Sequence, residues 1–208
     1  MTQKENIIDL KSTFGISAIR DQITTVGTGT VTNPIGSAEF TIKVTGTANK
    51  SATIRSVVRG EYVAGMGSEV GIAIRVDPTL PTGGIDAQWG YFDAMNGFYF
   101  GIDVGGLYVA YKKGGVETRT HEGAWNTDNM DGNGPSGRTL DLSKGIIYNI
   151  VFSWYGYGAI VWRVIHTDGN GKQATVTVHK FAPVSGTSVL NPNLPITATL
   201  KSDSGGNT

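Results

Sequence analysis

The stretch Ile147–Ile165 reads IYNIVFSWYGYGAIVWRVI and decides the fold. Two nearly continuous apolar and aromatic runs, Ile147–Tyr155 and Ala159–Ile165, are separated by the turn at Gly156–Gly158. Short runs of β-branched and aromatic residues bounded by glycine are typical of β-strands. We therefore expect a hairpin of two central strands, each buried on both faces.

Glycine and proline limit the helix content of the rest of the chain. Glycine accounts for 30 of the 208 residues, about twice the usual ~7%, and there are 7 prolines. Because glycine and proline disfavour a helix interior by about 1 and 3 kcal/mol relative to alanine, few segments suit a helix of average length. The one helix-compatible stretch is Glu5–Lys11. Elsewhere, alternating segments such as Glu39–Thr45, Val70–Val76 and Thr175–Phe181 predict strands.

Turn signals recur between these strands and define the fold class. Dipeptides such as Asn96-Gly97 and Gly114-Gly115 supply residues that tolerate positive φ. Ten or more short strands with turns every ~8 to 12 residues predict an all-β, antiparallel β-sandwich of the jelly-roll or lectin-like kind. Differences in amino-acid composition along the chain predict three parts. These are an extended N-terminal arm or linker at 1–35, a sandwich domain at 36–200 and a flexible tail or linker at 201–208.

The charge balance excludes several classes of partner. Lys and Arg total 17, Asp and Glu total 17, and charged residues make up only 16% of the chain. Without a cationic excess to neutralise phosphates, nucleic-acid binding is not expected. No apolar run reaches the ~18 to 20 residues of a transmembrane helix, so membrane insertion is not expected either. Cysteine is absent and the N-terminus lacks the pattern of a secretory signal, which favours assembly in a reducing cytoplasm.

The patterns of common catalytic sites are missing from the sequence. The histidines, at 121, 166 and 179, lack metal-ligand spacing, and no G-x-S-x-G nucleophile motif occurs. Gly27-Thr28-Gly29-Thr30 lacks the third glycine of a dinucleotide-binding loop. No E-x-D-x-x-E strand pattern places two carboxylates on one face, as a glycosidase in a sandwich fold would need. We predict a protein that is not an enzyme and has neither a cofactor nor a bound metal.

The most specific local sequence is Trp125–Gly137, which reads WNTDNMDGNGPSG. Asn and Asp close Asx-turns, Gly supplies left-handed positions and Pro stiffens the exit, which predicts a self-hydrogen-bonded structural loop. The alternative is a calcium loop with Asp128, Asp131 and Asn133 as oxygen ligands. The EF-hand order of ligands and the closing Glu are both absent from it.

Aromatic residues are concentrated in the middle of the chain. On a sandwich they would offer a platform on which sugar rings stack, and Asn and Asp side chains would accept hydrogen bonds from the sugar hydroxyl groups. The alternative is that they fill the core and cover subunit contacts. The candidate binding residues are Trp125, Asn126, Asp128, Asp131, Trp154, Tyr155 and Tyr157.

The 125–137 loop belongs to a longer set of motifs between residues 59 and 196. Its pattern is W-N-x-D-x-[LM]-D-G-x-G-P-S-G. The other segments of the set are Arg59–Tyr62, Glu69–Ile72, Trp89–Phe92, Asn96–Phe100, Leu140–Asp141, Trp154–Gly158 and Asn191–Ile196. Together they resemble a family of virion structural proteins from tailed bacteriophages and other double-stranded DNA viruses. The resemblance implies a virus particle as the context and carries over no catalytic residue.

These observations lead to one expected function and one alternative. We expect a non-enzymatic virion protein, made in the host cytoplasm, that builds a tail, fibre or capsid-surface component. Its partners would be further copies of itself and other virion proteins, with the arm and the aromatic strands making subunit contacts and with host attachment as an added role. The alternative is a carbohydrate-binding, lectin-like module that recognises a host-surface glycan.

Overall fold

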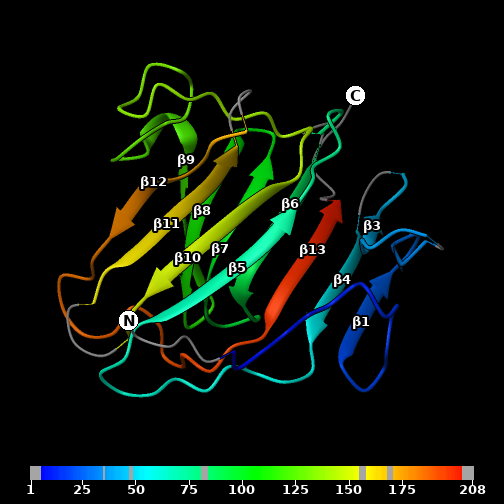
Figure 1. Ribbon diagram of the computed structural model, residues 1–208. Helices are drawn as coiled ribbons and strands as arrows, with labels where there is room; N and C mark the ends of the chain where they lie inside the picture. The colour runs from blue at the N-terminus through cyan, green and yellow to red at the C-terminus, as the bar shows by residue number, and fades with distance from the viewer. Residues whose placement is uncertain are drawn as a thin grey trace.

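Two antiparallel β-sheets, one of seven strands and one of four, pack face to face (Figure 1). The computed structural model describes residues 6–34, 36–46, 49–80, 84–154, 158–167 and 171–202. Within these residues the only helix is the short 3-10 turn η1 (Glu122–Ala124). The all-β sandwich predicted from the turn spacing is therefore confirmed.

The seven-stranded sheet has the spatial order β1-β4-β13-β6-β7-β8-β9, and the four-stranded sheet has the order β12-β11-β10-β5. The strands of the larger sheet, in that order, are Asp21–Val26, Lys50–Ser56, Ile196–Ser202, Ile85–Phe92, Gly97–Asp103, Gly106–Lys113 and Val116–His121. Those of the smaller sheet are Gln173–Phe181, Ile160–Thr167, Ile146–Phe152 and Ser68–Ile74. A separate two-stranded ribbon pairs β2 (Thr30–Thr32) with β3 (Thr41–Lys43).

Strands β10 and β11 form the hairpin predicted from the two apolar runs, with Ile150 opposite Trp162. Tyr148, Ile150 and Trp162 face the larger sheet and are buried. The prediction that both faces are buried is wrong for the outer face, where Ile147 remains 37% exposed. The reason is that the seven-stranded sheet covers only one side of this hairpin.

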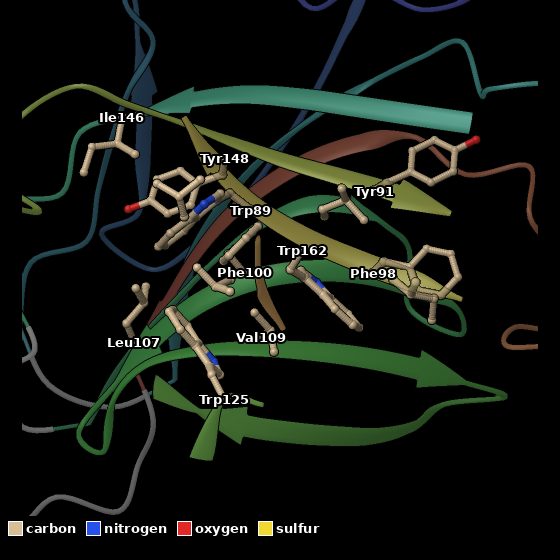
Figure 2. Close-up of a cluster of buried hydrophobic side chains, with 14 of the residues drawn as sticks. Trp89, Tyr91, Phe98, Phe100, Leu107, Val109, Trp125, Ile146, Tyr148 and Trp162 are labelled. Atoms are coloured by element: carbon tan, nitrogen blue, oxygen red, sulfur yellow. The ribbon is translucent and has the colours of Figure 1, made fainter. Parts of the chain in front are cut away.

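The core consists largely of aromatic rings held between the two sheets (Figure 2). Tyr148 of the smaller sheet lies 5.0 Å from Trp89 and 4.9 Å from Phe100, measured between ring centroids. Because side chains alternate along a strand, Phe98 and Phe100 point inward while Tyr99, between them, points to the outer face of the larger sheet. All three are fully buried within the chain. These three rings therefore pack within the chain and are not exposed on its surface.

The segment predicted as an N-terminal arm is partly built into the sandwich. Strand β1 pairs with β4 over six residues, because Ile23-Thr24-Thr25-Val26 is a β-branched run that suits an edge strand. Residues 6–11 of the helix-compatible stretch form no helix, since Ile8 packs against the core instead. At the other end, β13 continues to Ser202, past the predicted start of the tail, and residues 203–208 lie outside the described residues.

Candidate functional site

The Trp125–Gly137 loop follows η1 and covers the side of the sandwich where β9 and β12 are the outermost strands. Trp125 lies in the core, at 6% exposure, and its indole N–H donates to the Thr120 carbonyl at 3.0 Å (Figure 2). A ring in this position closes the gap between the two sheets. Trp125 is therefore not placed as an exposed stacking surface for a sugar.

Asn126 closes the free edge of β12 with its side chain. Its Nδ2 donates to the Lys180 carbonyl at 2.8 Å, and its Oδ1 accepts from the Lys180 N–H at 2.9 Å. The amide thus makes the pair of bonds that a residue of a neighbouring antiparallel strand would make. The next two residues, Thr127 and Asp128, both donate their N–H groups to the Val178 carbonyl at 3.2 Å. The loop therefore occupies part of an edge that would otherwise be open to another strand.

Asp128 organises the inside of the loop. Its Oδ1 accepts from the Met130 N–H at 2.8 Å, and its Oδ2 accepts from the Ser136 N–H at 2.7 Å. Gly134 packs directly on this carboxylate, so closely that a Cβ there would lie 2.4 Å from Oδ1. The carboxylate is buried, and its oxygens satisfy backbone donors on both arms of the loop.

Asp131 lies at the exposed tip of the same loop. Its Oδ1 accepts from the Asn133 N–H at 2.9 Å, and its backbone forms a β-bridge with Thr139. The hydrogen bonds from the backbone and side chain of Asn133 lower the pKa of Asp131. Asp131 and Asp128 thus make separate local turns. The contacts are those of the self-hydrogen-bonded loop, and no group of three His, Asp or Glu residues in the described part of the chain is arranged to hold a metal.

Trp154 belongs to a different part of the molecule from Trp125. It follows the end of β10, packs edge-on against Tyr62 with centroids 5.8 Å apart, and donates its indole N–H to the Val189 carbonyl at 2.8 Å. The structure does not bring it together with the 125–137 loop. Tyr155 and Tyr157, the remaining candidates for the platform, lie outside the described residues.

A polar cluster on the outer face of the larger sheet was missed by the sequence analysis. Arg119 of β9 donates Nη1 to Asp103 at 2.7 Å, Nη2 to Asp86 at 2.7 Å and Nε to Glu117. One guanidinium therefore ties together carboxylates from β6, β7 and β9. The signal that would have found it is the period of two in β9, which puts Glu117, Arg119 and His121 on one face.

The Tyr108 ring lies beneath the Arg119 guanidinium. The guanidinium carbon is 4.5 Å from the ring centroid, and the hydroxyl donates to Asp86 at 2.6 Å. Gly101 allows this arrangement, since a Cβ there would meet the Tyr108 ring at 2.3 Å. The ring, the guanidinium and the carboxylates form one layered unit across four strands.

The cluster favours the ionised forms of Asp103 and Glu117. Burial alone would raise the pKa of Asp103, but the hydrogen bonds from His121, Arg119 and the Gly105 N–H outweigh it and lower that pKa. Burial would likewise raise the pKa of Glu117, and the neighbouring Tyr99 hydroxyl and Arg119 lower it. Each charge has a partner inside the cluster, and these pairs link β6, β7 and β9.

Two hollows adjoin these elements, and both are small. One of about 150 Å³ lies beside Asp86, Asp103 and Arg119, and one of about 100 Å³ lies among Tyr111, Trp162 and Phe181. Pockets that enclose small-molecule ligands usually measure ~300 Å³ or more. Either hollow would admit part of a ligand rather than surround one.

The remaining histidines also have local partners. Nδ1 of His179 accepts from the Asn126 N–H at 3.2 Å, and burial lowers the pKa of this imidazole. Nδ1 of His166 lies 2.9 Å from a guanidinium nitrogen of Arg138. Both rings thus support the loop region between η1 and β10.

Comparisons with protein-family models, with curated proteins and with solved structures find no match to this chain. Among the residues that the structure describes, no helix has the length and hydropathy needed to cross a membrane.

Proposed function

We propose that this chain assembles with further copies of itself through exposed apolar side chains along one edge of the sandwich. Phe14 and Ile19 of the N-terminal segment are 78% and 88% exposed. Apolar residues are common singly on surfaces, whereas contiguous groups mark sites of protein contact. We call the exposed apolar residues of this segment and of the β4–β5 connection the end patch: Ile7, Phe14, Ile16, Ile19, Val57, Val58, Val63 and Met66.

Two segments that are distant in sequence build the end patch. The N-terminal segment and the β4–β5 connection run along the same edge of the sandwich (Figure 1). They are joined where the Val57 N–H donates to the Arg20 carbonyl at 2.9 Å, and again where Ile8 lies against Gly60. The Arg20 guanidinium fixes the conformation of the segment before β1, because it donates to the Gly15 carbonyl at 2.6 Å and to Asp21 at 2.8 Å. These bonds and contacts hold the two segments of the end patch against each other.

We propose that this chain is a non-enzymatic structural protein, a β-sandwich that assembles with further copies of itself through exposed apolar surfaces. The particular role we propose is that of a virion component of a tailed bacteriophage or other double-stranded DNA virus, in a tail, a fibre or the capsid surface. The end patch is the observation that carries the self-assembly. The resemblance of the motifs between residues 59 and 196 to virion structural proteins supports the proposed role in a virus particle.

Two features support this proposal over a catalytic or glycan-binding role. The polar groups of the 125–137 loop and of the Arg119 cluster bond to the protein's own backbone and side chains. The low content of charged residues, 16%, fits a protein whose surface is used in contacts with other proteins.

The virion role is tested by mass spectrometry of purified particles from cells in which the chain is made during infection. We expect the chain among the particle proteins, in a fixed ratio to the others. Finding it only in the soluble fraction of the lysate would overturn the virion role.

The end patch is tested by the double substitution Phe14→Ser and Ile19→Ser in the full chain. We expect light scattering coupled to size-exclusion chromatography to show smaller assemblies than for the unaltered chain. The matched control is Val184→Ser, because Val184 is 95% exposed and lies outside the patch. Point substitutions are preferable to removing residues 1–35, which would also remove β1. If the double variant and the control assemble alike, the end patch is not a subunit contact.

A further inference from the structure

The four-stranded sheet has an outer face that nothing described in the structure covers. In Figure 1 this sheet is the layer nearest the viewer, with no described strand or helix drawn across it. Because Tyr148, Ile150, Trp162 and Val164 are buried against the larger sheet, the alternate residues of β5, β10 and β11 point outward. In β12 a bulge opposite Trp162 and Arg163 shifts this alternation by one residue after Thr177. The outward residues are Glu69, Gly71 and Ala73 of β5, Ile147, Asn149 and Val151 of β10, Val161, Arg163 and Ile165 of β11, and Thr175, Thr177 and Lys180 of β12.

Strand register arranges these twelve residues in three rows across the sheet. The first row is Glu69, Val151, Val161 and Lys180, the second is Gly71, Asn149, Arg163 and Thr177, and the third is Ala73, Ile147, Ile165 and Thr175. A polar row therefore lies between two rows whose central pairs are β-branched aliphatic residues. The outermost positions of the first row carry opposite charges.

This pattern is complementary to itself. A two-fold axis that runs along the strands between β10 and β11 places β5 of one copy over β12 of the other and β10 over β11. Val151 then faces Val161 and Ile147 faces Ile165, while the Asn149 amide faces the Arg163 guanidinium. Within each chain the buried Asn149 amide donates to Glu69 Oε1 at 2.9 Å, which holds the carboxylate on this face. At the two outer edges, that carboxylate faces the Lys180 ammonium of the other copy. No position in the three rows meets a like charge.

We propose that a second copy of this chain packs on this face, sheet against sheet, about such a two-fold axis. The inference rests on the proposed self-assembly and names one of its contacts, separate from the end patch. Packed sheets lie about 10 Å apart with their strands within ~30° of each other, which keeps the aliphatic pairs close to the axis in contact. The long Glu69 and Lys180 side chains span the larger offset away from the axis and fix the register.

The charge pairs allow a direct test with the full chain. The single variants Glu69→Lys and Lys180→Glu each create two like-charge pairs in a symmetric dimer, and we expect each to weaken self-association about tenfold in sedimentation equilibrium. In a mixture of the two variants every pair is again of opposite charge, so the mixture recovers the association of the unaltered chain. The double variant Glu69→Lys/Lys180→Glu recovers it as well.

Two controls separate this contact from general effects. Ile147→Lys buries a charge among the central aliphatic pairs and abolishes the dimer, whereas Val116→Lys, on exposed β9, leaves it unchanged. Circular dichroism establishes that each variant is folded. Association by the unaltered chain that is insensitive to all of the sheet-face variants would overturn this interface and leave the proposed function standing. An unaltered chain that stays monomeric at the highest soluble concentration would overturn both.

Discussion

The side-chain amide of Asn126 pairs with the backbone of Lys180 through two hydrogen bonds, of 2.8 and 2.9 Å, across 54 residues of sequence. One side chain thereby takes the place of a strand at the edge of the smaller sheet. Edges of this kind are otherwise available for pairing with other chains. The conspicuous loop sequence is thus explained by edge closure and internal bonding.

Replacing Asn126 by aspartate separates this pairing from simple packing. Aspartate still accepts from the Lys180 N–H, but its second oxygen faces the Lys180 carbonyl, and two acceptors repel each other. We expect Asn126→Ala to lower the free energy of unfolding by about 1 to 2 kcal/mol, and Asn126→Asp by at least as much. Urea denaturation measures both. The control is Gln173→Glu, an amide-to-acid change at an exposed position of β12. An Asn126→Asp variant as stable as the unaltered chain would contradict the proposed pairing.

Two glycines near the loop differ in what surrounds them and make a matched pair. A Cβ at Gly134 would lie 2.4 Å from the Asp128 carboxylate, whereas a Cβ at Gly123 would meet nothing within 4 Å. We expect Gly134→Ala to lower the free energy of unfolding by about 1 to 3 kcal/mol, since the carboxylate must move away from its backbone donors. Gly123→Ala should be neutral within ~0.5 kcal/mol. Equal effects in thermal or urea unfolding would show that the Gly134 contact is not a constraint.

The Arg119 cluster predicts a dependence of stability on pH. Because the pKa values of Asp103 and Glu117 are lowered in the folded chain, their contribution is fully present above the unfolded values of ~4 and is lost as the pH falls through the folded values. We expect Arg119→Met to lower the free energy of unfolding by about 2 kcal/mol at pH 7, which is less than for a fully buried pair because Arg119 is 30% exposed. The variant should also lose less stability than the unaltered chain between pH 5 and pH 2.

The control for Arg119→Met is the same substitution at an arginine whose ion pair lies at the exposed surface. Arg75 bonds Glu39 at 2.8 Å, and both side chains are more than half exposed, so Arg75→Met should change stability by under ~1 kcal/mol at every pH. Urea denaturation over the pH range compares the variants. Parallel pH curves for Arg119→Met and the unaltered chain would refute the role assigned to the cluster.

The sequence predicted the strands whose pattern is local. Ile147–Ile165 forms its hairpin because β-branched and aromatic runs bounded by glycine favour strands wherever they lie. Whether one or both faces of such a strand are covered depends on how many sheets pack against it, and a local pattern does not contain that information. The exposed outer face at Ile147 therefore could not be predicted. Strand β1 was missed because Thr and Gly in the first 35 residues resemble a linker as much as an edge strand.

The candidate site was predicted less well, for a related reason. The loop at 125–137 was recognisable from its Asx, Gly and Pro residues, and its internal turns follow from them. The role of Asn126 depends on Lys180, which only the folded chain brings close. The local sequence around Trp125 is compatible with a side chain that faces solvent and with one that faces the core, so it does not distinguish the two.

The position of β13 has a consequence for how the chain is made. This last strand lies between β4 and β6, so in the seven-stranded sheet β1 and β4 are joined to β6–β9 only through residues 196–202. Synthesis therefore has to proceed through Ser202 before the larger sheet can close. Until then, β4 and β6 each present an unpaired edge, and such edges are prone to pair with other chains.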